Sequence, residues 1–399
     1  MSARSTTISV DAARRAAKRY LPPAVYGYVD GGKEGEATAI ANELAFSRVL
    51  FSPKVGCGVA APQTQVTVLG RRIAMPVVIA PTGFIRIVHT DGELGVARAA
   101  AAMGIPIALS HVSSVPVARV SEVNPDTWFQ MYMLDGRNGA ASAMEIAREA
   151  GCRVLVVTLD VAGIAPSDRR GRRLPSSLGV GEVLRFLPDA VRRPRWLASF
   201  LRGGLDMLAP NAPRKPDGRP YPLAEIGALI VRTPPTWADI EWIRQRWSGS
   251  LLLKGILRVD DAQRAVALGA DAISVSNHGG KVLDGTPAAI AALPEIVDAV
   301  GDKTEVLLDG GVRRGADVVR ACALGAKAVL IGRSYLWGLA AEGETGVADI
   351  LGLFRRGVAA TLADLGCPSI ERLDRSWLRP LPSQSHWNEL GERLHHRLD

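Results

Sequence analysis

The chain has 399 residues, 47% of them hydrophobic, and a formal net charge of +8. A chain of this length holds two or three average domains, although α/β barrels of about 250 residues or more fold as one domain. It has no apolar run of the ~18–20 residues that a membrane-spanning helix needs, and its start lacks the basic and apolar regions of a secretory signal. We therefore expect a cytoplasmic protein with a large core.

Charge distribution and cysteine content argue against a nucleic-acid-binding protein and against a protein held by metal sites or disulfides. The positive charge lies in residues 169–219, which contain 12 Lys and Arg against 4 Asp and Glu, whereas the rest of the chain is balanced. No nucleic-acid recognition motif accompanies this patch, so we expect no nucleic-acid partner. None of the four cysteines forms a CxxC pair, which argues against a metal site or a disulfide and favours reduced thiols.

The predicted elements begin with helices and continue with repeated strand–helix units. A helix is predicted over Val10–Tyr20, ended by Leu21-Pro22-Pro23, and a second helical stretch carries Tyr28. Eight short apolar runs follow, and such runs are typical of buried parallel strands. The runs are Val77–Ala80, Ile105–Leu109, Trp128–Tyr132, Val154–Leu159, Leu251–Leu253, Ala272–Val275, Val306–Leu308 and Ala328–Ile331.

These units predict an α/β fold, a closed (β/α)8 TIM barrel with an N-terminal helical segment. A doubly wound open sheet is the alternative. One interval, between the fourth and fifth strands, is much longer than the others. It ends in a predicted helix, Thr236–Trp247, whose Thr236 and Asp239 have the spacing of a capping box. The rest, about 163–235, is basic and proline-rich, and we expect a lid or interaction segment there, with a partly disordered surface loop as the alternative. We treat 1–399 as one barrel domain.

The ends of the predicted strands carry the chemistry, because a β/α barrel builds its active site at the C-terminal ends of its strands. His278 lies in Ser276-Asn277-His278-Gly279-Gly280, directly after the sixth strand. Histidine titrates near ~6.5, so His278 is the predicted general base, and Asp160 after the fourth strand is suited to orient it. Glycines and Arg333 after the last two strands indicate a phosphate site.

Other strand-end residues suit a planar, phosphorylated cofactor. Lys254 could stabilise the anionic form of a reduced ring, although barrel lysines also form Schiff bases or structural pairs. Asp309 and Arg313 could hold polyol hydroxyl groups. Ser110, Gln130 and Thr158 suit the polar edge of a heterocycle, although each alone is more often a satisfied polar group of a barrel.

At these residues the chain resembles the FMN-dependent 2-hydroxy-acid oxidases and dehydrogenases, such as glycolate oxidase, lactate oxidase and mandelate dehydrogenase. The resemblance runs from Tyr28 to about Gly366. The matching motifs are Ala80-Pro81-Thr82, Trp128–Tyr132, Thr158-Leu159-Asp160, Leu253-Lys254-Gly255, Ser276–Gly280, Asp309–Gly315 and Gly332-Arg333.

The resemblance implies FMN as cofactor, a small-molecule substrate, an acceptor that is oxygen, a quinone or a redox protein, and a homo-oligomer, often a tetramer. It implies His278 as base, Asp160 as its partner, and Tyr28 and Tyr132 facing the substrate. The implied FMN-binding residues are Pro81, Thr82, Gly83, Ser110, Gln130, Thr158, Lys254, Ser276, Asp309, Gly311, Arg313, Gly332 and Arg333.

Two departures from the family concern the substrate carboxylate, which members hold with two arginines. Lys281 stands where the first arginine is expected, and Ser167 where the second is expected, with Arg169 and Arg170 close behind. Lysine cannot reproduce the bidentate guanidinium fork. The carboxylate site is therefore altered, or it is rebuilt by Lys281 together with Arg169 or Arg170.

A closer resemblance is to the mycofactocin-system branch, which contains pre-mycofactocin synthase. It is carried by Leu251–Gly255, Arg258–Ala262, Asp284–Pro287, Ser334–Ala340 and Arg193–Leu197. This branch implies two-electron oxidation at a carbon next to a carbonyl group in a biosynthetic pathway. The alternative is an L-2-hydroxy-acid oxidase or dehydrogenase.

The rival interpretation of the insertion is membrane docking. Val183–Leu201 mixes apolar and basic residues as an interfacial amphipathic helix does, and membrane-bound mandelate dehydrogenases use a segment of this region. An interior lid or a subunit contact is the alternative.

Overall fold

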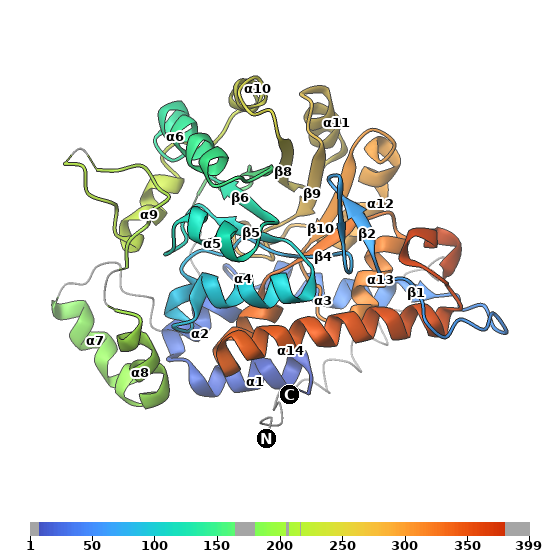
Figure 1. The fold of residues 1–399 in the computed structure, drawn as a ribbon, viewed down its shortest axis with the longest axis horizontal. Coiled ribbons are helices and arrows are strands. Elements are labelled where there is room, and N and C mark those ends of the chain that lie inside the picture. Colours follow the sequence, from blue (N-terminus) through green and yellow to red (C-terminus); the bar gives the residue numbers. More distant parts are fainter. Residues whose placement is uncertain (1–7, 164–179, 205–206, 216, 380–399) are drawn as a thin grey trace.

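The protein, described as a computed structural model over residues 8–163, 180–204, 207–215 and 217–379, contains a closed barrel of eight parallel strands (Figure 1). The barrel closes because the last strand pairs with the first, at Leu330 and Val78. The predicted TIM barrel is confirmed, and the open sheet is excluded. The strands are β4 (Val77–Ile79), β5 (Ile107–Ser110), β6 (Thr127–Met131), β7 (Val154–Thr158), β8 (Ser250–Ile256), β9 (Ala272–Ser276), β10 (Glu305–Asp309) and β11 (Ala328–Ile331).

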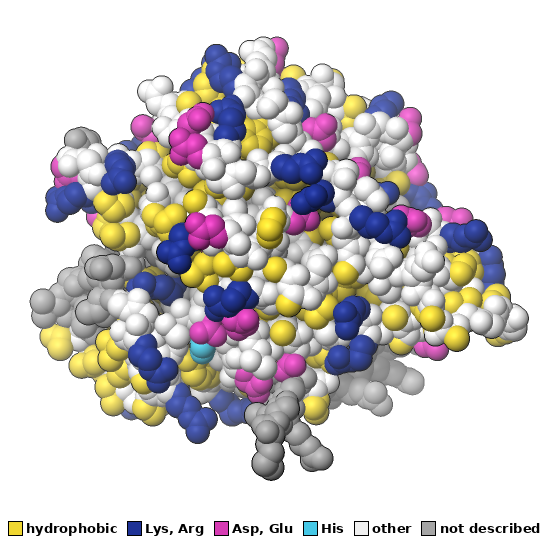
Figure 2. All heavy atoms as spheres, in the orientation of Figure 1, with side chains coloured by type: hydrophobic (Ala, Val, Ile, Leu, Met, Phe, Trp, Pro, Cys, Tyr) yellow, Lys and Arg dark blue, Asp and Glu magenta, His cyan; other side chains and the backbone are white. Residues whose placement is uncertain are grey.

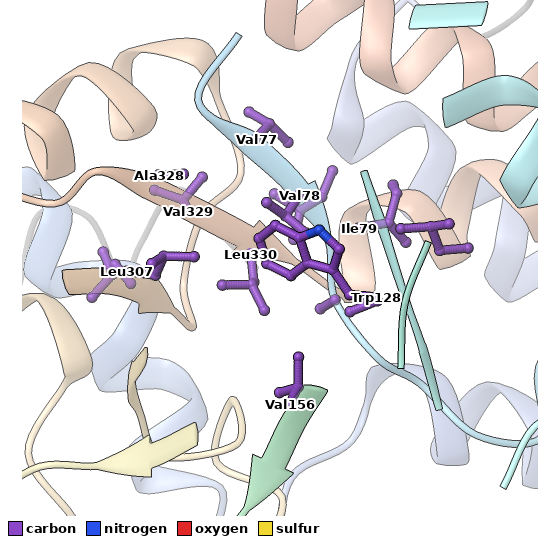
Figure 3. Packing of buried hydrophobic residues seen from close by; sticks show 14 of the residues in the cluster. Val77, Val78, Ile79, Trp128, Val156, Leu307, Ala328, Val329 and Leu330 are labelled. Atoms are coloured by element: carbon purple, nitrogen blue, oxygen red, sulfur yellow. The ribbon is translucent and has the colours of Figure 1, made fainter. Parts of the chain in front are cut away.

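The strands are mostly apolar because helices cover one face and the barrel interior covers the other. Every residue of β4, β6 and β7 is buried. Figure 3 shows side chains from these strands and from β10 and β11 gathered in one cluster, in which Trp128 is one of the largest buried side chains. β5 starts at Ile107 because Pro106 has no backbone N–H for the ladder. β8 runs past the predicted Leu253 through a register shift around Gly255.

An outer ring of helices follows the strands. The break inside the longest helix lies at Glu342 and Gly343, whose backbone is not helical. The ring helices are α4 (Gly92–Met103), α5 (Val117–Val123), α6 (Gly136–Glu149), α10 (Trp237–Arg244), α11 (Val259–Ala267), α12 (Ala289–Val300), α13 (Gly315–Ala323) and α14 (Arg333–Leu365). The capping box predicted for Thr236 and Asp239 is present at the start of α10.

The N-terminal segment consists of α1 (Val10–Tyr20), α2 (Pro23–Asp30) and α3 (Ala37–Leu44). α1 has the predicted bounds, and it lies along α14 (Figure 1). Arg14 fixes this packing, because its guanidinium pairs with Asp30 at 2.7 Å and lies 5.0 Å from the ring centre of Trp337. The segment thereby reaches the end of the barrel where the predicted site lies.

The described parts of the insertion form α7 (Val180–Val191), α8 (Pro194–Arg202) and α9 (Leu223–Ile230), which lie together at one side of the barrel (Figure 1). Trp196 anchors α8, because its buried indole N–H donates to the carbonyl of Ile87 at 2.8 Å. α9 packs on the barrel mouth through Ile226 and Leu229. Residues 164–179 lie outside the described ranges.

Two small antiparallel pairs were not predicted. β2 (Val66–Val68) and β3 (Arg71–Ile73) form a hairpin whose turn residues, Leu69 and Gly70, both have positive φ. This is the backbone of a tight hairpin turn, which Gly70 favours. β1 (Leu50–Phe51) pairs with β12 (Leu378–Arg379). Within the described ranges, no helix combines the length and hydropathy needed to cross a membrane.

A pair of buried asparagines joins the N-terminal segment to the His278 motif. Asn42 and Asn277 exchange two side-chain hydrogen bonds, of 2.8 and 2.9 Å. Asn42 Oδ1 also accepts from the backbone N–H of Ala289 at the start of α12. The residue after Asn277 is therefore held in place by a contact with a segment more than 230 positions away.

We predict that Asn42→Ala lowers the free energy of unfolding by about 2–4 kcal/mol, because it leaves buried groups of Asn277 and Ala289 without partners. Urea unfolding followed by circular dichroism measures this. Ser47→Ala is the matched control, since its hydroxyl makes one exposed hydrogen bond to Leu44. An equal loss in both variants would contradict the role given to Asn42.

Candidate active site

A cleft of about 930 Å³ opens at the C-terminal ends of the barrel strands. Its walls come from strand ends, from the N-terminal segment and from the insertion. Most of the site residues predicted from the sequence line it together. They are Tyr28, Pro81, Thr82, Gly83, Tyr132, Lys254, His278, Lys281, Asp309, Gly311, Arg313, Gly332 and Arg333. Arg169, the predicted second substrate contact, lies outside the described residues.

His278 and Asp160 form a pair, with Nδ1 of the imidazole 3.0 Å from Oδ1 of the carboxylate. Since a carboxylate accepts, Nδ1 carries the proton, and Nε2 is the nitrogen able to accept another. Asp160 Oδ2 is buried and has no hydrogen-bond partner among the described residues. Burial would raise the pKa of Asp160, but the charges of His278 and Lys254 outweigh it, so the pKa lies below its usual value. Asp160 therefore stays ionised and stabilises a charged imidazole.

The backbone at this pair is unusual. His278 has φ of 56°, a left-handed conformation that is uncommon for residues other than glycine. Its N–H donates to Ser276 Oγ at 3.0 Å, which holds the strained turn. Gly255 has φ of 107°, and a Cβ there would lie 2.6 Å from Cβ of Asp160. A side chain at position 255 would therefore displace the carboxylate from His278.

Lys254, Ser276 and Asp309 join the ends of three neighbouring strands. Lys254 Nζ lies 2.8 Å from Asp309 Oδ2 and 3.0 Å from Ser276 Oγ, and Ser276 donates to Asp309 at 2.8 Å. Burial would lower the pKa of Lys254, but the carboxylates of Asp309 and Asp160 raise it above its usual value. Lys254 is thus a fixed positive charge on the cleft wall, and Ser276 lies beneath it as a connector.

Ser110, Gln130 and Thr158 form a hydrogen-bonded row across β5, β6 and β7. Gln130 Nε2 donates to Thr158 Oγ1 at 2.9 Å, and Ser110 Oγ donates to Gln130 Oε1 at 3.2 Å. All three side chains are buried below the cleft. The structure thus brings these three predicted residues together, and their side chains hydrogen-bond to one another.

Arg313 and Arg333 are held by the N-terminal segment. Arg313 donates to Glu43 at 2.7 Å, while its buried Nε has no partner among the described residues. Arg333 donates to the carbonyls of Asp30, Gly31 and Gly279 at 2.8–3.1 Å. Burial lowers the pKa of Arg333 to about 10, with the charge of Arg313 as the second cause. Arg333 therefore remains a cation at neutral pH.

Lys281 turns toward backbone carbonyls. Its Nζ donates to the carbonyl oxygens of Tyr28 at 2.7 Å and Gly31 at 2.9 Å. Burial, and next the charge of Arg333, lower the pKa of Lys281 well below its usual value. The charged ammonium form of Lys281 is therefore less favoured over the neutral amine than in an exposed lysine. The two backbone carbonyls already accept two of its three N–H groups.

Tyr28 and Tyr132 line the cleft from the N-terminal segment and from the end of β6. The Tyr28 hydroxyl donates to the carbonyl of Gly83 at 2.8 Å. Burial raises the pKa of both phenols, and the charge of Asp160 adds to the rise for Tyr132. Both therefore stay protonated, and the one O–H of Tyr28 is already used by the Gly83 carbonyl.

Several cleft residues were missed from the sequence. Phe84, Val112 and Ile230 add an apolar side to the cleft. Phe84 has φ of 58°, and Ile230 comes from α9 of the insertion. Phe84 directly follows Gly83, so its position after a predicted site motif was a usable signal. Ile230 carries no local signal, because only the fold brings the insertion to the mouth.

Comparison with known proteins identifies the family. The FMN-dependent dehydrogenase family matches residues 17–380. The chain belongs to this family. It is 46% identical over 367 residues to pre-mycofactocin synthase of Mycobacterium tuberculosis (strain H37Rv), covering 92% of each chain, and 40% identical over 374 residues to L-lactate dehydrogenase of Azorhizobium caulinodans, covering 92% and 97%. The crystal structure of the monotopic membrane protein (S)-mandelate dehydrogenase aligns with a TM-score of 0.84 and 35% identity, covering 94% of this chain and 100% of that chain.

The protein is therefore an FMN-dependent oxidoreductase, and the residues of the cleft fit this cofactor. The buried Nε of Arg313 needs an acceptor, which an anionic or hydroxyl oxygen supplies. Lys254 supplies a buried positive charge, which suits the reduced, anionic ring.

Proposed function

We propose that this enzyme removes two electrons from a carbon next to the carbonyl of an amide or lactam, in a biosynthetic pathway like that of pre-mycofactocin synthase. The observation that carries the proposal is Lys281, whose amine is bound to the carbonyls of Tyr28 and Gly31. A 2-hydroxy acid needs a strong, free cation at its carboxylate, and a lysine with a lowered pKa supplies a weak one. An uncharged amide carbonyl needs only hydrogen-bond donors.

The mechanism assigns one proton transfer to His278. Nε2 takes a proton from the substrate, while Nδ1–H remains bound to Asp160 and the carboxylate stabilises the new charge. Tyr132, protonated at neutral pH, donates a hydrogen bond to the substrate oxygen, while Tyr28 lines the same cleft with its hydroxyl bound to Gly83. Phe84, Val112 and Ile230 keep water from that side of the cleft.

FMN, when bound, accepts the two electrons. Lys254 and the Ser110–Gln130–Thr158 row would face its ring, and Asp309, Arg313 and Arg333 would hold its ribityl chain and phosphate. Pro81, Thr82, Gly83, Gly311 and Gly332 would form the surrounding wall. The homology to the FMN-dependent dehydrogenases and the position of these residues at one barrel mouth support this assignment.

A second candidate function is docking to a membrane surface through α7 and α8. Four apolar side chains there are 44–60% exposed. They are Leu184, Leu187, Val191 and Leu201. Arg192, Arg195 and Arg202 are exposed among them, and Figure 2 shows hydrophobic and basic side chains gathered over this corner. An apolar face flanked by arginines suits an anionic bilayer surface. The aligned mandelate dehydrogenase is a monotopic membrane protein, which supports the proposal.

We predict that His278→Asn retains FMN but slows flavin reduction by about 10²–10⁴-fold, because it removes the base. Asparagine tolerates the left-handed backbone at this position, so the fold is kept. Anaerobic stopped-flow absorbance of the flavin measures the rate. Asp160→Asn should slow reduction less than His278→Asn does, since it removes only the stabilising charge. Near-normal reduction by His278→Asn would refute the base assignment.

Amides are predicted to reduce the flavin faster than the matching acids. The test is anaerobic titration with acid–amide pairs, lactate with lactamide and 2-hydroxy-phenylacetate with 2-hydroxy-phenylacetamide, together with α-amino amides. Lys281→Arg should shift the preference toward the acids by about tenfold or more, because arginine restores a bidentate cation. Faster reduction by the acids in the natural enzyme would favour a 2-hydroxy-acid oxidase or dehydrogenase instead.

The docking proposal predicts that the protein sediments with vesicles containing phosphatidylglycerol at low salt, and binds phosphatidylcholine vesicles weakly. The double variant Leu184→Ser/Leu187→Ser should lower the affinity on the order of tenfold or more. Leu283→Ser is the matched control, because Leu283 is equally exposed, at 62%, and lies outside the insertion. Absence of binding to the anionic vesicles would end this proposal.

A further inference from the structure

We infer that His111 is a positioning residue that couples Tyr132, a wall of the cleft, to the insertion through Asn211. The inference rests on the proposed function only in treating the cleft as the substrate site. His111 directly follows β5, and its side chain is fully buried. The chemistry assigned above does not use it.

The two ring nitrogens of His111 hold different backbone groups. Nε2 lies 3.0 Å from the carbonyl oxygen of Asn211, and Nδ1 lies 3.2 Å from the backbone nitrogen of Tyr132. A carbonyl only accepts and a peptide N–H only donates, so Nε2 carries the proton and Nδ1 does not. The geometry therefore requires a neutral imidazole. Burial agrees with this, because it lowers the pKa of His111 to about 4.

Each group needs this histidine because no regular element satisfies it. β6 ends at Met131, so the N–H of Tyr132 lies just beyond the strand. Asn211 lies in the insertion between α8 and α9, outside any helix or strand. A buried backbone group without a partner is costly, and an apolar side chain at position 111 would leave both groups without one. A histidine can donate from one side and accept on the other.

The side chain of Asn211 anchors the insertion, and the residue is buried, with 2% of its surface exposed. Its Oδ1 accepts from the N–H of Val117 at the start of α5, at 2.9 Å. Its Nδ2 donates to Ser113 Oγ at 2.7 Å and to the carbonyl of Val115 at 2.9 Å. These three bonds fix the insertion to the loop between β5 and α5, directly beside His111.

Apolar packing reinforces the same connection. A cluster beside the link contains residues of the insertion and of the barrel, and Tyr132 packs against it. Its buried members are Val112, Leu134, Ala209, Ala212, Ile226 and Leu229. Ile230, at the end of α9, also contacts this cluster and lines the cleft with Tyr132. A shift of the insertion at Asn211 therefore reaches Tyr132 through His111, and displacement of a substrate-facing group by about 1 Å weakens catalysis.

Two substitutions at position 111 separate the two bonds. The Oδ1 of asparagine takes the place of Nδ1, so His111→Asn keeps the acceptor for Tyr132 and loses Asn211. The Nε2 of glutamine takes the place of histidine Nε2, so His111→Gln keeps the donor to Asn211 and loses Tyr132. Asn211→Ala tests the coupling from the far end without touching either ring contact.

The first readout is hydrogen exchange by mass spectrometry on the FMN-loaded protein, in overlapping peptides that resolve the Tyr132 N–H and cover 207–215. We expect Asn211→Ala to speed exchange in 207–215 and, through His111, to speed exchange at Tyr132 by about tenfold or more. His111→Gln should speed exchange at Tyr132 alone. Faster exchange in 207–215 with an unchanged Tyr132 in Asn211→Ala would overturn the coupling.

The second readout is the split between KM and kcat, with the acid or amide that reduces the natural enzyme fastest. His111→Gln and Asn211→Ala should raise KM on the order of tenfold with kcat within about threefold, and His111→Asn should lie nearer the natural enzyme. Equal KM in all variants would reduce His111 to a structural residue. Exchange requires no substrate, so a wrong substrate class changes only the second readout. Ser113→Ala, which removes one bond of Asn211, gives a milder form of the exchange test if Asn211→Ala does not fold.

Discussion

A buried ion pair between Lys254 and Asp309 holds the candidate site together. Ser276 bridges the pair, so one hydroxyl and two charges join the ends of β8, β9 and β10. Removing either charge would leave the other buried and unpaired, which is far more costly than removing both. The strand ends are therefore fixed relative to one another by an interaction that depends on charge.

The His278 pair depends on this network in two ways. Ser276 accepts the N–H of His278, which holds a left-handed turn that histidine adopts only at a cost. Lys254 also lowers the pKa of Asp160, the carboxylate that orients the imidazole. Gly255 lies between them, because its missing side chain lets Asp160 approach β8. The geometry of the His278–Asp160 pair thus depends on Lys254, Ser276 and Gly255.

Sequence patterns predicted the barrel and most of the cleft, since both depend on local signals. Buried parallel strands are apolar on both faces, and their ends place His278, Asp160 and Lys254 at one mouth. The register shift at Gly255, the hairpin turn at Gly70 and the start of β5 after Pro106 had local signals that were not used.

The partners supplied by distant segments had no local signal. Asn42 and Glu43 hold Asn277 and Arg313 across more than 230 residues, and no periodicity encodes such a pair. His111 had no local signal of its role either. Its partners, the Tyr132 N–H and the Asn211 carbonyl, are backbone groups, which the residue types in a sequence do not distinguish.

The contacts between the N-terminal segment and residues late in the chain also limit the order in which the protein can fold during synthesis. The carbonyls of Asp30 and Gly31 bind Arg333, some 300 positions later in the chain. Arg333 leaves the ribosome near the end of translation. The first helices therefore wait through most of synthesis without the partner that positions them. Contacts of such high contact order form slowly, because a long loop must close first. Truncation at the C-terminal quarter would thus leave the opening residues of the chain, as well as its last ones, without a place to dock.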